Sequence, residues 1–218
     1  MNTAPELQQL LSAQTLWHAG RGSAKEGVEG QSTGHPALDG LLPQRGWPRR
    51  ALTELLLPAD GVGELQLLLP TLARLSQAGA AVAVIAPPYL PYAPAWQAAG
   101  VSLQHLQLID AAPRDALWAF EQCLRSGACS AVLGWPKQAD AQALRRLQVA
   151  ADTGHCLGFA VRERRHADNP SPAALRLEAV RPEAAGRGAR GQALGTRWQV
   201  RKCRGGPAPA QAFALRAG

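Results

Sequence analysis

The sequence predicts an α/β fold with a mainly parallel sheet that helices cover on both faces. Of its 218 residues, 46% are hydrophobic, which is enough apolar material for one sizeable core. From residue 51 onward, short apolar runs alternate with segments whose apolar residues recur at helical spacing. Repeated β-α units of this length are typical of parallel sheets, because the crossover helices must lie on the faces of the sheet.

The alternating segments can be placed in chain order. The expected strands are residues 51–57, 80–86, 105–109, 129–135 and 156–162. The expected helices are residues 64–78, 94–99, 113–126 and 139–153. After about Ala173 the pattern changes to short strands with Gly and Pro between them, which predicts an antiparallel C-terminal extension.

The N-terminal part is expected to stand apart from this core. Residues 1–20 are predicted to form an amphipathic helix, and the capping-box spacing of Thr3 and Glu6 marks its start. Residues 21–34 are rich in Gly and Ser and read as a flexible linker to the core at 35–218. The helix either docks on a partner or folds back on its own core. Its candidate partner-binding side chains are Leu7, Leu10, Leu11 and Trp17.

Charge is unevenly placed along the chain. Residues 1–150 carry 11 Lys/Arg and 11 Asp/Glu, whereas residues 151–218 carry 12 and 5, so the net charge of +7 lies in the last part. A basic part from about residue 163 fits contact with single-stranded DNA or an acidic partner, and an arginine-rich solvated surface is the alternative. The candidate DNA-contacting residues are Arg162, Arg164, Arg165, Arg201, Lys202 and Arg204.

Composition also excludes several classes of protein. The N-terminus has no signal peptide pattern, and no apolar run approaches the roughly 20 residues of a membrane span, so we expect a cytoplasmic protein without a membrane partner. The 4 cysteines and 5 histidines are scattered, without metal-ligand spacing or a catalytic constellation. We therefore expect no metal, no cofactor and no catalytic residue of these kinds.

The segment "LLLPADGVGELQLLLP" has the outline of a phosphate-binding loop without its functional residues. Such a loop needs glycines, a lysine for the terminal phosphates and a hydroxyl for Mg²⁺. Glu64 and Leu65 stand where the lysine and the hydroxyl belong. Because a carboxylate is stabilised at a helix N-terminus, the Glu64 side chain can take the position in which such a loop would bind a phosphate. The residues of this degenerate loop are Pro58, Asp60, Gly61, Gly63, Glu64 and Leu65.

The segment "PPYLPYAP" follows the second expected strand. Its prolines favour an extended conformation in which Tyr89 and Tyr92, three residues apart, point to the same side. A loop at the carboxyl end of a parallel strand is a common place for a binding site. Tyr89 and Tyr92 are therefore candidate partner-binding residues, with simple stiffening of the loop by proline as the alternative.

Several segments together carry a family resemblance over residues 32 to about 215. The stretches "ELQLLLPTLARL", "IAPPYLPYAP", "SGACSAVLGW" and "LGFAVRE" resemble the ImuA family of RecA-like proteins associated with translesion DNA synthesis, and also the related SulA cell-division inhibitors. The segment from Ser32 to Pro87 resembles the opening of the RecA core. The resemblance implies a RecA-like P-loop fold.

The resemblance also implies which functional positions are lost. Where the RecA pattern has Gly-Lys-Thr, this chain has Gly63, Glu64 and Leu65. The position of the later metal-binding aspartate falls on Trp135, and that of the water-activating glutamate falls on Pro88. We therefore expect no ATPase activity.

The preferred function is that of a non-catalytic accessory protein of the damage-induced SOS system for translesion synthesis. The implied partners are RecA and a Y-family-like polymerase subunit of the ImuB kind, or an error-prone polymerase of the replicative type, with single-stranded DNA and a second copy of the chain as further partners. The alternative is a SulA-like inhibitor that binds the division protein FtsZ. The SulA resemblance fades after about Arg165, whereas this chain continues with basic strands.

Overall fold

The computed structural model describes residues 29–180 and 196–215, which form one sheet of eight strands in the order β3-β2-β4-β5-β1-β6-β7-β8. The strands are β1 Ala51–Leu57, β2 Ala81–Ile85, β3 Leu106–Ile109, β4 Cys129–Gly134, β5 Leu157–Glu163, β6 Leu175–Val180, β7 Arg197–Cys203 and β8 Phe213–Ala214. The helices are α2 Pro36–Leu41, α3 Glu64–Gln77, α4 Ala93–Ala98, α5 Pro113–Arg125 and α6 Ala141–Thr153, with 3-10 turns η1 Leu103–His105 and η2 Arg164–His166.

The mainly parallel sheet is confirmed. Of the described strands, only β7 runs against its neighbours, β6 and β8. The prediction that the antiparallel extension begins at about Ala173 was wrong for β6, which pairs parallel with β1. The connection from residue 164 to 174 returns the chain to the opposite edge of the sheet, so β6 runs parallel to β1. This connection contains no long helix whose apolar spacing could be recognised in the sequence.

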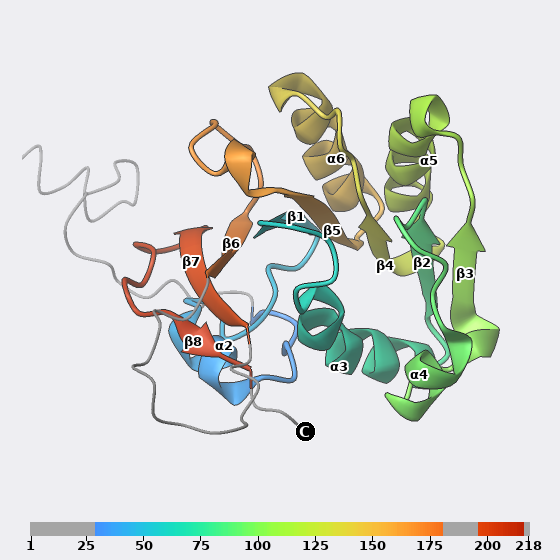
Figure 1. Ribbon diagram of the computed structural model, residues 1–218, viewed down its shortest axis with the longest axis horizontal. Coiled ribbons are helices and arrows are strands. Elements are labelled where there is room, and N and C mark those ends of the chain that lie inside the picture. Colours follow the sequence, from blue (N-terminus) through green and yellow to red (C-terminus); the bar gives the residue numbers. More distant parts are fainter. Residues whose placement is uncertain (1–28, 181–195, 216–218) are drawn as a thin grey trace, which may run out of the picture.

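Helices cover both faces of the sheet (Figure 1). Helices α5 and α6 pack together on one face, and α3 lies on the other, with α2 on the α3 side near β7 and β8. Strand β1 shows why two cores form: Leu55 and Leu57 belong to the core under α3, whereas Leu52 belongs to the core under α5 and α6. Alternate residues of a strand point to opposite faces, so a strand buried on both faces must be apolar throughout.

The start of the described chain differs from the expected linker. Residues 30–34 pack on the core: Gln31 forms an antiparallel bridge with Trp47, and Gly30 and Thr33 are buried. Trp47 in turn donates from Nε1 to Thr71 Oγ1 at 2.8 Å. The predicted linker, residues 21–34, therefore extends too far, because residues 30–34 belong to the core. A Gly- and Ser-rich composition does not show that such a segment pairs with another part of the chain. Helix α2, six residues long, was not expected either.

Candidate functional site

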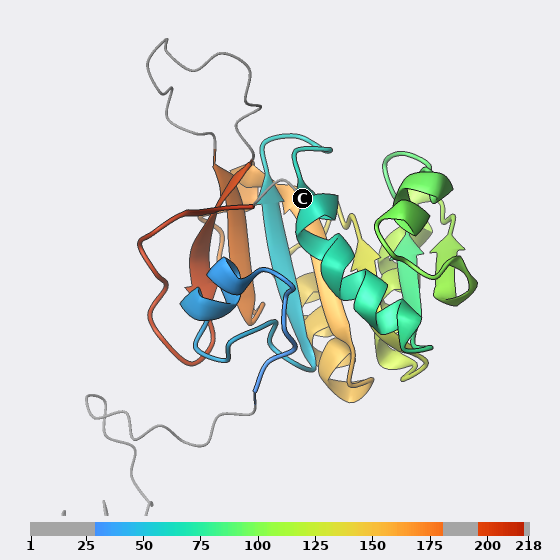
Figure 2. The ribbon, with the colours of Figure 1, turned by 90° about the horizontal axis from the view of Figure 1, so that it is seen from below.

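The loops that follow the parallel strands gather at one edge of the sheet. The connections after β1, β2, β4 and β5 all leave its carboxyl edge, because these strands run in one direction. Figure 2 shows the loop after β1 at this end of the strand, with α3 beginning from it. In open α/β sheets this edge is where binding sites form. It carries the degenerate loop, the Tyr89–Tyr92 segment and Trp135.

The degenerate loop is closed by its own carboxylate. Glu64, 3% exposed, accepts a hydrogen bond from the Gly61 N–H at 2.7 Å and another from the Gly63 N–H at 3.1 Å. Gly61 and Gly63 have φ of 81° and 115°, a region that favours glycine. Their N–H groups thus point at a side chain of the protein, in the position where such a loop would present them to a phosphate.

The loop is also fixed from the side of β7. The Thr196 hydroxyl donates to the Val62 carbonyl oxygen, and a Cβ at Gly63 would lie 3.0 Å from Thr196 Oγ1. Leu65 packs against the core under α3, so this position offers no ligand to a metal ion. Lys137, in the connection after β4, lies 3.7 Å from Asp60 as a surface ion pair.

The other two positions that the RecA resemblance assigns to nucleotide chemistry hold apolar side chains. Trp135 follows β4 and is 9% exposed, and its Nε1 has no hydrogen-bond partner among the described residues. Pro88 lies in the segment after β2. Neither side chain can bind a metal ion through a carboxylate or activate a water molecule.

An apolar surface lies on the connection between β2 and α4. Tyr89, Leu90 and Tyr92 are 72%, 82% and 70% exposed, and we call these three residues the β2–α4 patch. Tyr89 and Tyr92 were predicted from the sequence but Leu90 was not, although a leucine between prolines and tyrosines was a usable signal. Exposed neighbouring apolar side chains are typical of interaction sites.

One candidate DNA-contacting residue was wrongly assigned. Arg162 is 5% exposed and donates from Nη1 to Glu54 Oε1 at 2.8 Å and from Nη2 to the Ala139 carbonyl oxygen at 2.6 Å. The reason is strand parity: residue 162 of β5 faces α6, on the same side as Ala160, which lies in the core there. A guanidinium held in this way cannot reach a DNA phosphate.

The remaining basic candidates lie on the surface, and several are paired. Arg164 and Arg201 both contact the Glu178 carboxylate, and Arg201 also pairs with Asp168. Arg165 pairs with Glu163, and Lys202 donates to the Ser171 carbonyl oxygen. Arg204 is exposed. These five residues remain candidates for contact with a DNA backbone.

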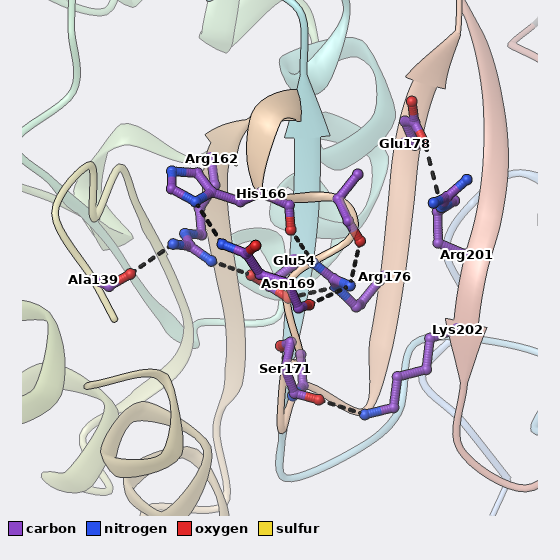
Figure 3. Close-up of polar contacts among 12 residues, drawn as sticks. Glu54, Ala139, Arg162, His166, Asn169, Ser171, Arg176, Glu178, Arg201 and Lys202 are labelled. Carbon is purple, nitrogen blue, oxygen red and sulfur yellow. Dashed lines mark hydrogen bonds and ion pairs between the residues drawn. The ribbon is translucent and has the colours of Figure 1, made fainter. Parts of the chain in front are cut away.

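Arg162 belongs to a buried ion cluster that the sequence analysis did not find (Figure 3). Glu54, fully buried on β1, also accepts from Arg176 Nε at 2.7 Å. Arg176, on β6, further donates to the carbonyl oxygens of Ala167, Asn169 and His166. The cluster of Glu54, Arg162 and Arg176 therefore joins β1, β5, β6 and the connection after β5. A glutamate inside the apolar run "ALTELLL" was the signal that could have indicated it.

Other expectations lie partly outside the described residues. Leu7, Leu10, Leu11 and Trp17 belong to residues 1–28, which the structure does not describe. Over residues 29–180 and 196–215, no group of three or more His, Cys, Asp and Glu residues could hold a metal ion. No helix in the described part is long and apolar enough to cross a membrane. Burial raises the pKa of the thiols Cys123, Cys129 and Cys203, so they are protonated near neutral pH.

Comparisons with known proteins relate part of this chain to a family. Residues 51–158, just under half of the 218 residues, match the family model of the cell division inhibitor SulA. Among 401 matching chains of solved structures is the crystal structure of SulA from Pseudomonas aeruginosa, at 28% identity and a TM-score of 0.43, covering 51% of this chain and 97% of that one. No curated protein matches the chain.

The fold and the site together define a mixed α/β protein with a helix-flanked, mainly parallel sheet. At the carboxyl edge of the sheet, the loop after β1 holds a carboxylate of the protein itself. The segment that matches the SulA family model runs from β1 to the start of β5, and it includes both this loop and the β2–α4 patch. Strands β6 to β8 lie beyond the matched segment.

Proposed function

We propose that the protein is a non-catalytic, RecA-like accessory protein of the SOS response that acts by binding other proteins. The observation that carries this proposal is the Glu64 carboxylate in the loop after β1, at 2.7 Å and 3.1 Å from two backbone nitrogens. A phosphate would have to displace this carboxylate and would meet an anion instead of a lysine. Binding of a partner, by contrast, needs only apolar area and shape.

The preferred role within the SOS response is support of translesion synthesis, in the manner of ImuA. What favours it is the part of the chain beyond residue 158, where the SulA match ends. Strands β6, β7 and β8 extend the same sheet, and the Glu54 cluster ties β6 to β1 and β5. The ImuA resemblance covers these strands, whereas the SulA resemblance fades before them. The partners of this role are RecA and an ImuB-like polymerase subunit.

A second role is inhibition of cell division through FtsZ. It is favoured by the family match of residues 51–158 to the cell division inhibitor SulA. That segment contains the β2–α4 patch, so the same surface serves either role. The two roles differ in the partner and not in the mode of action.

We propose that the β2–α4 patch is the docking surface for this partner. Three large apolar side chains that are 70–82% exposed lie within four consecutive residues there. Tyrosine is frequent among interface residues that dominate binding, because its ring buries a large area at low cost in side-chain entropy. The strand that precedes the patch, β2, is paired on both sides, which fixes the start of this loop.

The test measures binding of the full chain to purified RecA, an ImuB-like polymerase subunit and FtsZ. Saturable binding to RecA or to the polymerase subunit is expected. The triple variant Tyr89→Ser, Leu90→Ser, Tyr92→Ser should weaken it by about 100-fold or more, since a cost of about 1 kcal/mol for each of the three truncated anchors adds up to about 3 kcal/mol. The matched control, Trp118→Ser with Val149→Ser, removes exposed apolar side chains from α5 and α6 and should bind like the wild type.

Each contrary result has a clear meaning. Binding to FtsZ alone would replace the preferred role by division inhibition. Binding to none of the three proteins would reject the proposed function. Equal affinity of the patch variant and the wild type would reject the β2–α4 patch as the docking surface.

A further inference from the structure

A pocket that includes neither the degenerate loop nor the β2–α4 patch has no role in the proposed function. It has a volume of about 470 Å³ and lies between the start of α6 and the connection that follows β5. Its walls include Ala139, Asp140, Leu144, Arg162, His166 and Pro170. The pocket therefore combines an apolar wall with two nitrogen-bearing side chains.

The first of these side chains, Arg162, has one N–H group without a partner. Its Nη1 and Nη2 groups donate to Glu54 and to the Ala139 carbonyl oxygen, but its buried Nε has no acceptor among the described residues. The Arg162 side chain is 4% exposed, so bulk water does not surround this group. A buried donor without an acceptor is unfavourable, and arginine keeps its charge at all physiological pH values.

The second side chain, His166, presents another such group. The Asn169 Nδ2 atom lies 3.3 Å from His166 Nδ1. Since an amide nitrogen can only donate, Nδ1 accepts and the ring proton lies on Nε2. This Nε2 atom is buried and has no partner among the described residues. Burial, with Arg162 and Arg165 nearby, lowers the pKa of His166, so the ring is neutral at pH 7.

The charge around the pocket disfavours a ligand that carries more than one negative charge. In the cluster behind it, the two guanidinium groups of Arg162 and Arg176 face the one carboxylate of Glu54, which leaves one positive charge in excess. Asp140, on the pocket wall, caps α6 by accepting from the Ala143 N–H at 2.7 Å, and its negative charge offsets this excess, so a dianion would be repelled more strongly than a monoanion. Two N–H donors match the two oxygens of a carboxylate, whereas a phosphate dianion brings more charge and more acceptors.

We propose that this pocket binds a small monocarboxylate. One carboxylate oxygen accepts from Arg162 Nε and the other from His166 Nε2, while the hydrocarbon part lies against Ala139, Leu144 and Pro170. The carboxylate comes either from a free short-chain acid or from the C-terminus of a peptide. Both sources share the chemistry that the two donors recognise.

The test uses the full chain labelled with ¹⁵N and follows the side-chain signals of Arg162 Nε and the His166 ring. Sodium butyrate is expected to shift both signals with saturation in the millimolar range. Butyramide, which has the same shape without the charge, and inorganic phosphate should shift them at least tenfold less. No saturable shift with butyrate, or an equal response to phosphate, would overturn the proposal.

The matched variants are His166→Phe and His105→Phe. Both remove a half-buried histidine, but His105 lies in η1, outside the pocket. With folding checked by circular dichroism, His166→Phe should weaken butyrate binding at least tenfold, read from the Arg162 Nε signal, and His105→Phe should leave it unchanged. Equal affinity of His166→Phe and wild type would overturn the assignment. Arg162 itself is left intact, because its replacement would unbalance the charge of Glu54.

Two further probes distinguish the sources of the carboxylate. Acetyl-Ala-Ala with a free C-terminus is compared with the same peptide as its amide. Binding of the acid at an affinity equal to butyrate or tighter supports a peptide C-terminus as the ligand. Binding of butyrate without binding of the peptide acid supports a free short-chain acid.

Discussion

Two buried glutamates in neighbouring elements are stabilised by different hydrogen-bond donors. Glu64, at the start of α3, accepts from backbone N–H groups of the loop that immediately precedes it. Glu54, on β1, accepts from two guanidinium groups that come from β5 and β6. The first arrangement is local and closes a loop. The second joins three strands, so its loss affects the sheet as a whole.

The comparison predicts a large loss of stability when Glu54 is removed. In Glu54→Ala, Arg162 and Arg176 stay buried without their carboxylate, which should lower the free energy of unfolding by about 3–5 kcal/mol. Urea denaturation measures this. Glu121→Ala is the matched control, since Glu121 also contacts two arginines, Arg125 and Arg146, but these are about half exposed. The control should cost less than about 1 kcal/mol. Similar costs for both variants would contradict the role given to the cluster.

Removal of Glu64 should have a smaller and more local effect. In Glu64→Ala, the N–H groups of Gly61 and Gly63 lose their acceptor, but water can replace it at the surface of the loop. We expect a loss of about 1–2 kcal/mol in the free energy of unfolding. Hydrogen exchange should become faster at these two amides by a larger factor than in β5 and β6, where it rises only as far as the lower free energy of unfolding requires. Unchanged exchange at Gly61 and Gly63 would show that the carboxylate does not hold the loop.

The smallest predicted effect is a pH dependence of the free energy of unfolding that comes from His166, next to the Glu54 cluster. Burial lowers the pKa of His166 below its ordinary value of 6.5, so the unfolded chain binds a proton more readily than the folded one. The folded state should therefore lose stability as the pH falls below about 6.5 and through the lower folded pKa. The wild type should lose more stability than His166→Phe between pH 7 and pH 5 in urea denaturation. Parallel pH profiles would contradict this.

The sequence predicted the local features of the fold well. The strand of residues 51–57 and the helices from Glu64 and Pro113 agree with β1, α3 and α5 within a few residues. Their apolar spacing is a property of neighbouring residues, and so is the position of Glu64 beside the glycines of its loop. The exposed tyrosines of the β2–α4 patch could be predicted for the same reason, since the prolines around them restrict the loop.

Long-range contacts could not be predicted in this way. Arg162 looked like a surface residue because "VRERRH" is rich in charge, and only the pairing of β5 with β1 brings it toward Glu54. Arg176 was missed for the same reason, since its partner lies 122 positions away along the chain. The packing of residues 30–34 depends on Trp47 and Thr71, which no local composition reveals.

The most direct test of the central claim, that the loop after β1 holds Glu64 in place of a nucleotide phosphate, is calorimetric titration of the full chain with ATP in the presence and absence of Mg²⁺. Because Glu64 places a negative charge where the phosphates would need a positive one, and because Leu65 and Trp135 offer no metal ligand, no magnesium-dependent binding is expected at millimolar ATP. A magnesium-dependent dissociation constant in the micromolar range would contradict the account.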